Sequence, residues 1–377
     1  MTSFTIQGWC PSALRPMLAG DGLVVRLRPA MARLTAIQSQ GLARAALTHG
    51  NGLLDLTSRG NIQLRGVQPE THLPLLDDLA ALDLLDPKVS EVNLTISPFW
   101  TGDPWQTAAQ SVTKVLADPE FANLPSKFGV ALDIDRPMVL QSTPADIHIE
   151  WHREGWLIRP DAHSTGALAH TVPDLTTQLR TLLHWFLPSV SAGRGRMAAL
   201  AGHPMPTGFD HPMTATTFHP HPGPQALGHL VGLAFGQLRA ETLAALATTA
   251  IRITPWRMIL IEGAQVPDLP DLPDLPDLPD LPDLIATPDD PLLNVTACTG
   301  APGCPQALQP TRDLARRLAP QVPPGRHLHV SGCAKGCAHP APANVTLTAT
   351  AQGFTLIRNG RAADPGTPAP TNPFKAL

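Results

Sequence analysis

The sequence predicts an α+β fold in which one β-α-β-β unit occurs twice. Both copies show the same order of a strand, a helix, a strand ending in threonine and a last strand, at residues 21–67 and 227–262. The same order of elements with little residue identity is typical of an internal duplication. Because each unit leaves a sheet edge unpaired, we expect the two copies to pair with each other into one larger sheet.

In the first copy, alternation in G-L-V-V-R-L-R-P predicts a strand with Arg26 and Arg28 on one face. Apolar residues at helical spacing predict a helix over residues 35–48, and Gly50-Asn51-Gly52 ends it. Strands at 53–57 and 62–67 flank the turn S-R-G-N. The second copy has strands at 227–234, 251–254 and 257–262 and a helix at 239–249.

Other elements are expected between and after the copies. Strands at 89–98 and 127–134 precede an amphipathic helix at 171–186, and residues 203–224 are rich in His and Pro and poorly structured. A strand at 295–298, a helix at 310–318, a strand at 327–331 and a hairpin at 344–350 and 353–358 follow. Arg312, Arg316 and Arg317 should lie on the solvent side of that helix, and the Pro-rich tail should be loose.

A chain of 377 residues with 43% hydrophobic composition should form two or three compact units. We expect a first half-domain at 10–80, an α/β domain at 85–200, a second half-domain at 224–264, a spacer at 265–289 and a cysteine-bearing domain at 290–365. The spacer contains six tandem P-D-L triplets from Pro267 to Leu284. Proline at every third position excludes a helix and predicts an extended acidic segment on the surface, with a docking role for a partner as the alternative.

The net charge of −4 does not favour nucleic-acid binding. The chain starts without a basic region followed by an apolar run, and no window approaches about 18 unbroken apolar residues, so we expect a cytoplasmic protein without membrane contact. The duplication already supplies two halves within one chain, which favours a monomer.

Four of the five cysteines form two close pairs, Cys298 and Cys304 in A-C-T-G-A-P-G-C-P, and Cys333 and Cys337 in H-V-S-G-C-A-K-G-C-A-H-P. Four thiolates in two pairs can surround one [4Fe-4S] cluster, and the neighbouring glycines let backbone N–H groups approach the sulfurs. Zinc is the alternative, although its ligand pairs are usually closer. We expect Cys10 to pack as a small apolar residue.

With these elements placed, the chain resembles the nitrite and sulfite reductase family. The resemblance rests on the two cysteine motifs and on L-T-S-R-G-N-I-Q-L-R-G at 56–66, and it covers about residues 8–361 apart from the P-D-L spacer. It implies ferredoxin-like half-domains that hold an anionic tetrapyrrole beside a [4Fe-4S] cluster. In that family the last cysteine also bridges to sirohaem iron, and whether Cys337 bridges anything is left open.

Within the family, residues 9–26 (W-C-P-S-A-L-R-P-M-L-A-G-D-G-L-V-V-R) and 252–263 (R-I-T-P-W-R-M-I-L-I-E-G) resemble the oxygen-dependent branch of aerobic cobalamin synthesis. That resemblance implies a monooxygenase that converts precorrin-3A to precorrin-3B by ring hydroxylation and lactone formation. It implies O₂ and NADH as the source of electrons, a possible electron-donor protein, and a non-haem iron beside the cluster. The substrate would occupy the place that sirohaem holds in the reductases.

A tetrapyrrole fringed with acetate and propionate groups needs several guanidinium groups, because Arg binds a carboxylate through two parallel hydrogen bonds. We expect roughly half of the candidate arginines to contact ligand and the others to be ordinary surface residues. The candidates are Arg26, Arg28, Arg59, Arg65, Arg252 and Arg257, with Asn61 and Gln63 on the side of Arg59 and Arg65, and with Lys127 and Lys335.

The match to the reductases' oxyanion site is incomplete. Arg26 and Lys127 match its cations, but Gly129 stands in place of a lysine and Val92 in place of an arginine. Each charge-assisted hydrogen bond contributes about 1.5–3 kcal/mol, so two losses would weaken the binding of sulfite or nitrite. A sirohaem-dependent nitrite or sulfite reductase is therefore the alternative, followed by a zinc-stapled tetrapyrrole carrier without catalysis.

Non-haem iron usually takes two histidines and a carboxylate. The candidate ligands are histidines, and each is more simply explained as a solvated loop residue: His203, His211, His219, His221, His229 and His339. No residue is assigned as catalytic on the sequence.

Overall fold

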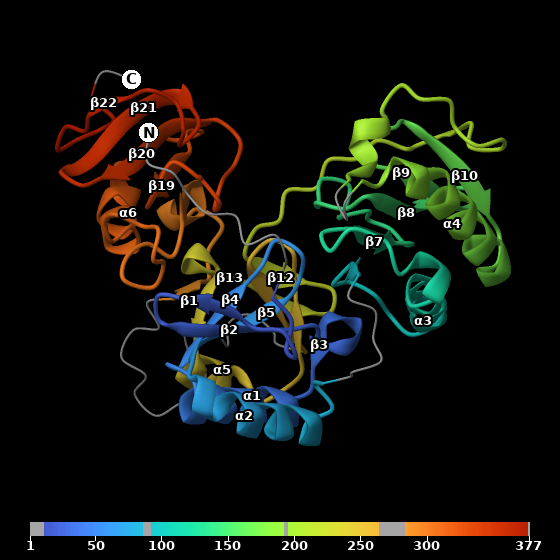
Figure 1. Ribbon diagram of the computed structural model, residues 1–377, viewed down its shortest axis with the longest axis horizontal. Coiled ribbons are helices and arrows are strands. Elements are labelled where there is room, and N and C mark those ends of the chain that lie inside the picture. Colours follow the sequence, from blue (N-terminus) through green and yellow to red (C-terminus); the bar gives the residue numbers. More distant parts are fainter. Residues whose placement is uncertain (1–10, 86–91, 192–194, 264–282, 376–377) are drawn as a thin grey trace.

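The computed structural model describes residues 11–85, 92–191, 195–263 and 283–375, and it has three parts (Figure 1). Two half-domains form the base, an α/β lobe built from β6 to β11 stands on one side, and a cysteine lobe built from β18 to β22 stands on the other. The α+β class predicted from the sequence is confirmed. Among the helices that the structure describes, none combines the length and apolar character needed to cross a membrane.

The first half-domain contributes four strands to a five-stranded sheet of order β1-β2-β5-β4-β14. Its elements are β1 (Met17–Ala19), β2 (Gly22–Leu27), β3 (Arg33–Leu34), α1 (Ala36–His49), β4 (Leu53–Leu56), β5 (Ile62–Val67) and α2 (Pro69–Ala81). The predicted strand at 62–67 is confirmed at both ends, and α1 begins after Thr35, whose side chain accepts from the Gln38 amide in a capping box.

The second half-domain forms a sheet of order β12-β13-β16-β15-β3, with β17 paired to β13. Its elements are β12 (Gly223–Gln225), β13 (Gly228–Leu233), β14 (Gln237–Arg239), α5 (Ala240–Leu246), β15 (Ile251–Ile253), β16 (Met258–Glu262) and β17 (Leu284–Ile285). Each half thus lends one short strand to the other: β14 pairs with β4, and β3 pairs with β15. The expectation of one larger sheet is wrong, because reciprocal exchange closes two separate edges.

The duplication extends to the hydrogen bonds of equivalent turns. The Thr57 hydroxyl accepts from the amides of Arg59 (3.3 Å) and Asn61 (3.2 Å), and the Thr254 hydroxyl accepts from those of Trp256 (3.2 Å) and Met258 (3.3 Å). The threonine that ends each strand therefore shapes the turn that follows it. Two 3₁₀ turns, η1 (Ala30–Ala32) and η5 (Ala234–Gly236), are likewise equivalent, each with a left-handed middle residue.

One hydrophobic core serves both half-domains. It joins Leu42, Leu54 and Leu64 of the first copy to Leu243 and Ile259 of the second, all nearly inaccessible to solvent. In Figure 1, α1, α2 and α5 cover the side of the two sheets that lies away from the two lobes. The opposite side is therefore available to meet the lobes.

The α/β lobe has a six-stranded sheet of order β11-β10-β9-β8-β7-β6, in which β6, β7 and β8 are parallel. Two amphipathic helices, α3 and α4, pack on its apolar face. Its elements are β6 (Asn93–Ile96), α3 (Trp105–Leu116), β7 (Gly129–Asp133), β8 (Ile147–His152), β9 (Gly155–Pro160), β10 (Thr165–Ala169), α4 (Val172–Phe186) and β11 (His211–Pro212). The sequence predicted β6, β7 and α4.

The cysteine lobe has a sheet of order β18-β19-β20-β21-β22, with β18 (Val295–Ala297), α6 (Arg312–Leu318), β19 (Leu328–Ser331), β20 (Ala343–Thr350), β21 (Gly353–Gly360) and β22 (Thr367–Pro368). Two expectations are corrected. Arg312 and Arg316 bond Asp55 and Asp283, so they face the half-domains, not the solvent. The tail adds β22 and buries Phe374. Most of the P-D-L spacer and Cys10 lie outside the described residues.

Arg252 on β15 links the second half-domain to the α/β lobe. Its guanidinium donates to the Glu262 carboxylate (2.5 Å) and to the carbonyls of Pro98 (2.9 Å) and Trp100 (2.6 Å), and it lies 4.3 Å from the centre of the Trp100 ring. Its side chain is only 8% exposed. Glu262 also binds Arg33 at 2.8 Å, so one carboxylate serves two arginines.

We predict that Arg252→Ala lowers the free energy of unfolding by about 3–5 kcal/mol, because it removes one of the two arginines that bind the part-buried Glu262 carboxylate and leaves two carbonyls without this donor. The measurement is urea denaturation followed by far-UV circular dichroism. Arg153→Ala is the matched control, since Arg153 is 80% exposed and pairs with its neighbour Glu154. Equal effects of the two substitutions would contradict this role for Arg252.

We predict that the free energy of unfolding falls in acid because Glu262 becomes protonated. Hydrogen bonding from Arg33 is the main cause that lowers the pKa of Glu262 from 4.5 to about 2. A depressed carboxyl pKa stabilises the folded state above pH 4.5, and this contribution disappears as the pH falls towards 2. The melting temperature of Glu262→Gln should therefore lie below that of the wild type at pH 6, and the difference between the two should narrow towards pH 2. A difference that does not change with pH would contradict this role of the Glu262 charge.

Candidate functional site

A row of polar side chains crosses the first sheet on the face that turns away from the shared core. The strand registers place Arg26 opposite Gln63, Gln63 opposite Asp55, and Asp55 opposite Gln237. With the Gln63 amide oriented to accept, the Arg26 guanidinium donates to its oxygen at 2.8 Å. The Gln237 amide donates to Asp55 at 3.1 Å. The half-domains therefore present one continuous polar face.

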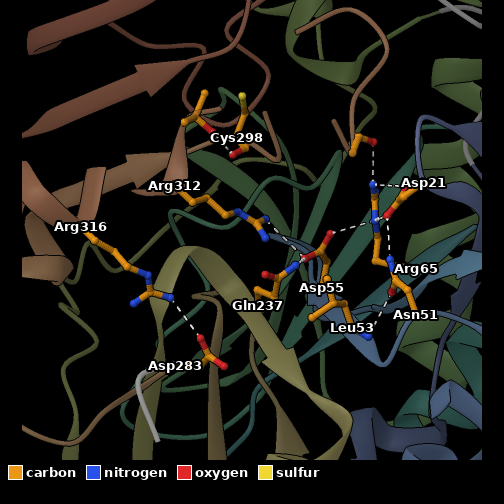
Figure 2. Close-up of polar contacts among 12 residues, drawn as sticks. Asp21, Asn51, Leu53, Asp55, Arg65, Gln237, Asp283, Cys298, Arg312 and Arg316 are labelled. Atoms are coloured by element: carbon orange, nitrogen blue, oxygen red, sulfur yellow. Dashed lines mark hydrogen bonds and ion pairs between the residues drawn. The ribbon is translucent and has the colours of Figure 1, made fainter. Parts of the chain in front are cut away.

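Arg65 lies on this face but is occupied by protein partners (Figure 2). Its guanidinium donates to both carboxylate oxygens of Asp21 (2.7 and 3.1 Å) and to the Gly303 carbonyl (2.9 Å), and it lies 3.7 Å from Asp55. Its side chain is 8% exposed. Arg65 thus ties the sheet to the loop of the first cysteine pair, and Arg312 of α6 adds a contact to Asp55 at 3.4 Å.

Arg257 reaches the second cysteine pair. It is half-buried in the turn before β16, has a left-handed backbone (φ 60°) and donates to the Ala338 carbonyl at 3.2 Å. Burial is the main cause that lowers its pKa, and the charges of Asp55 and Cys337 oppose that shift. Gly236 of η5 lies against Arg257. A Cβ at Gly236 would lie 2.8 Å from the Arg257 side chain, so η5 has no room for a larger side chain at this position. Arg257 therefore lies between the polar face and Cys337.

The two cysteine loops are in contact through their backbones. The Leu308 amide donates to the Gly332 carbonyl (2.8 Å), and the Gly332 amide donates to the Cys298 sulfur (3.1 Å). A Cβ at Gly332 would lie 2.6 Å from the Ala307 side chain, so glycine is needed for this approach. The loops bring the two pairs into one region of the lobe.

The four thiols act on one another electrostatically. Desolvation and the charges of the other cysteines raise the pKa of Cys333, and raise that of Cys337 to about 11, although Cys337 is the most exposed of the four at its surface. As their side chains stand, the described residues contain no group of three or more His, Cys, Asp or Glu side chains arranged to hold a metal ion. The four thiols fit a thiolate-ligated cluster in donor type, and the contacting loops place both pairs in one region of the lobe.

Three imidazoles pack edge to face beside the second cysteine pair. The rings of His327 and His329 lie 4.6 and 5.6 Å from that of His339. Burial lowers the pKa of His327 to about 4 and that of His329 to about 3, so both are neutral at pH 7. The remaining candidates for an iron site do not join them: His203, His211, His219 and His221 lie in the long segment before β13, and His229 is buried in β13.

Arg59 and Asn61 face the α/β lobe. The Arg59 guanidinium donates to the Lys127 carbonyl at 2.7 Å, and the Asn61 amide donates to Asn93 at 2.7 Å. Arg28 and Asn61 also line a cavity of about 610 Å³ between this half-domain and α3. Lys335 is exposed between the last two cysteines, where its charge opposes the rise in their pKa values without reversing it.

The structure divides eight of the ten predicted binding residues into three groups, while Arg28 lines the cavity beside α3 and Lys335 is exposed. Arg26, Gln63 and Arg257 lie on or beside the polar face, Arg59, Asn61 and Lys127 meet at the α/β lobe, and Arg65 and Arg252 connect parts of the protein. Sequence reasoning missed other residues that the site brings together, namely Asp21, Asp55, Arg312 and His327. The alternation H-L-H-V-S could have indicated that His327 and His329 share one face of β19.

Comparisons with known proteins agree on one family. Residues 15–82 match the model of the nitrite/sulfite reductase ferredoxin-like half domain. A precorrin-3B synthase from Sinorhizobium sp. is 30% identical over 94% of this chain and 83% of its own length. The structure of the NirA protein of Mycobacterium tuberculosis covers 93% of this chain and 77% of its own with a TM-score of 0.65; at 16% identity this likeness concerns the fold.

We predict that Arg65→Lys loosens the first cysteine loop, because one ammonium cannot bond both Asp21 oxygens and the Gly303 carbonyl together. The Cys304 amide, which bonds the Gly300 carbonyl at 2.8 Å, should exchange with deuterium about 10-fold faster. Arg358→Lys on β21 is the control, since Arg358 makes one long contact with the Lys375 carbonyl (3.4 Å). Unchanged exchange in Arg65→Lys would show that the loop keeps its shape without this clamp.

Proposed function

This chain belongs to the precorrin-3B synthase family, a branch of the nitrite and sulfite reductase fold, and from that premise we propose that it is an oxygen-dependent oxidoreductase of cobalamin synthesis. In the proposed reaction, precorrin-3A is hydroxylated and closes a lactone to give precorrin-3B. One atom of O₂ enters the product and the other leaves as water, and NADH supplies the two electrons. An electron-donor protein is the proposed intermediary.

The observation that supports the proposal best is the position of Arg257. It binds the backbone beside Cys337, and its charge also reaches Asp55 on the polar face of the half-domains. A flat macrocycle lying on that face would have the second cysteine pair at one edge. Arg26, held against Gln63, and Arg257 would then bind its carboxylate arms through paired hydrogen bonds.

Cys298, Cys304, Cys333 and Cys337 are the proposed ligands of a [4Fe-4S] cluster, which when bound would pass electrons one at a time towards the substrate. The chain's own residues prepare that position. The Gly332 amide donates to the Cys298 sulfur, which places a backbone hydrogen-bond donor beside a proposed ligand. Lys335 adds a positive charge that partly offsets the negative charges of the thiolates.

Binding and exclusion of water are the tasks assigned to the remaining residues. Neutral His327 and His329 pack against the ring of His339, two residues after Cys337, and their proposed task is to limit the access of water to the second cysteine pair. Arg65 donates to the Gly303 carbonyl of the first cysteine loop and Arg312 of α6 binds Asp55 of the sheet, and these two contacts hold the cysteine lobe against the first half-domain. The predicted histidines do not gather into a set for non-haem iron among the described residues, and the proposal assigns that iron no step.

The decisive experiment incubates anaerobically purified protein with precorrin-3A, a reductant and ¹⁸O₂, and follows the product by mass spectrometry. We expect uptake of one labelled oxygen atom, and none under nitrogen. Absence of uptake in an iron-replete sample, together with a sirohaem absorption spectrum, would instead identify a nitrite or sulfite reductase. Gly129 and Val92, in place of two oxyanion-binding cations, argue against that outcome.

Cluster ligation is tested separately by iron and acid-labile sulfide analysis of Cys333→Ser. Loss of a thiolate should lower both contents at least several-fold, because oxygen is a poor ligand for this cluster. Ser331→Ala is the control, since its hydroxyl bonds the Cys333 carbonyl but offers no sulfur. Zinc in place of iron in the wild type would overturn the cluster assignment.

A further inference from the structure

Two buried carboxyl groups lie side by side in the sheet of the α/β lobe. Asp133 ends β7 and stands opposite Glu150 of β8 in the parallel ladder, and both side chains are almost inaccessible to solvent. Arg159 of β9 donates to both oxygens of Glu150, at 2.6 and 3.1 Å. Within the described residues no ion pair includes Asp133, which therefore has a carboxylate as its neighbour and no cation as its partner.

The two oxygens of Asp133 have different surroundings. Oδ2 accepts from the amides of Val139 (2.5 Å) and Leu140 (2.7 Å), whereas Oδ1 is buried and has no hydrogen-bond partner in the part of the chain that the structure describes. A buried carboxylate oxygen without a donor is costly, and a proton on Oδ1 removes that cost. Burial is the main cause that raises the pKa of Asp133 to about 7, and the charge of Glu150 adds to the shift while the two amides oppose it.

A count of charges in this cluster gives the same result. His148, two residues before Glu150, lies 3.9 Å from Glu150 and 3.7 Å from Asp161. Even with His148 protonated, three carboxyl groups therefore face two cations, and one further proton balances them. The other charged groups on elements packed around this face are exposed or bound elsewhere: Asp135 is exposed, Arg136 lies 3.6 Å from the centre of the Trp151 ring, Asp146 accepts from the Gly129 amide, and Arg252 pairs with Glu262.

Both carboxyl groups hold the loop between β7 and β8, residues 134–146. Asp133 binds its backbone at residues 139 and 140, and the Gln141 side chain donates to Glu150 at 3.2 Å. The same Gln141 side chain donates to the Thr214 carbonyl (2.8 Å) and accepts from the Thr216 amide (3.0 Å), which ties the segment before β13 to this loop. The position of the loop thus depends on the two groups beneath it.

The loop meets the second half-domain through aromatic rings. Val139 and Leu140 belong to a small buried core against which Phe99, Phe218 and Trp256 pack. Trp256 lies in the turn between β15 and β16, with its ring 6.2 Å from that of Phe99 and 5.1 Å from that of Phe218. The residue after Trp256 is Arg257, which reaches the second cysteine pair. A change in the loop is therefore transmitted to a contact between two parts of the protein.

We propose that Asp133 is a pH-sensitive latch on the loop 134–146, closed while its carboxyl group keeps a proton on Oδ1 and loosened when that proton leaves. An open loop exposes Asp133 to water, where its pKa returns towards 3.8. Closing the loop therefore takes up a proton. The closed form is favoured in acid and loses this advantage as the pH rises through 7, the pKa of Asp133 in the closed form. The latch does not depend on the proposed function, and its test uses no substrate.

The test compares the wild type with Asp133→Asn, in which one oxygen still accepts from both amides and the side chain carries no charge at any pH. Deuterium exchange of the Leu140 amide is measured at pH 6 and pH 8 and corrected for the intrinsic effect of pH on exchange. Protection in the wild type should fall about 10-fold between the two, as linkage requires for a pKa of about 7, and should not change in Asp133→Asn. Asp135→Asn, exposed on the same loop, is the matched control and should respond as the wild type does.

Infrared difference spectra between pH 6 and pH 8 locate the proton independently. The wild type should show the carbonyl band of a buried carboxylic acid at pH 6 and lose most of it at pH 8, and Asp133→Asn should lack the band. A band that persists in Asp133→Asn would place the proton on another carboxyl group, such as Glu150, and would overturn the latch.

Two further results would overturn the latch without any variant. One is equal protection of the wild-type Leu140 amide at both pH values. The other is an equal change in the amides of α1, which lies in the first half-domain, because the whole protein and not the loop would then respond to pH.

Discussion

The reciprocal exchange of β3 and β14 is the constraint on which the rest of the structure depends. Each half-domain alone would expose an unpaired strand edge, and each edge is closed by two or three residues from the other half. The exchange brings both copies onto one core and directs their helices to one side. The opposite side is left as a polar face towards the two lobes.

Duplication then supplies two equivalent turns with different tasks. Thr57 and Thr254 shape the turns that carry Arg59 and Arg257, with matching hydrogen bonds to the backbone. Because the two copies are placed in different surroundings, Arg59 meets the α/β lobe and Arg257 meets the second cysteine pair. A repeated piece of backbone thus presents a cation at two separate margins of one face.

Some arginines of this protein connect its parts, and others border the proposed ligand site. The two kinds differ in the partners that their guanidinium groups bind. Arg65 and Arg252 are deeply buried and bonded to Asp21 and Glu262, and each also donates to backbone carbonyls of a neighbouring part. Burying such a group is costly unless every donor is satisfied, so these residues specify how the parts fit. Arg257 donates to the Ala338 carbonyl beside the second cysteine pair and borders the proposed ligand.

The class of fold, the strand at 62–67, the helix α1 and the two cysteine pairs were predictable from the sequence alone. They depend on residues close together in the chain: alternation, helical spacing, a glycine stop and short intervals between cysteines. The pairing of the sheet edges, the inward direction of Arg312 and Arg316, and the use of Arg65 and Arg252 as clamps became visible only in the tertiary structure. Asp21 and Gly303 are both partners of Arg65 yet lie far apart in the sequence, and local patterns carry no information on such distant contacts.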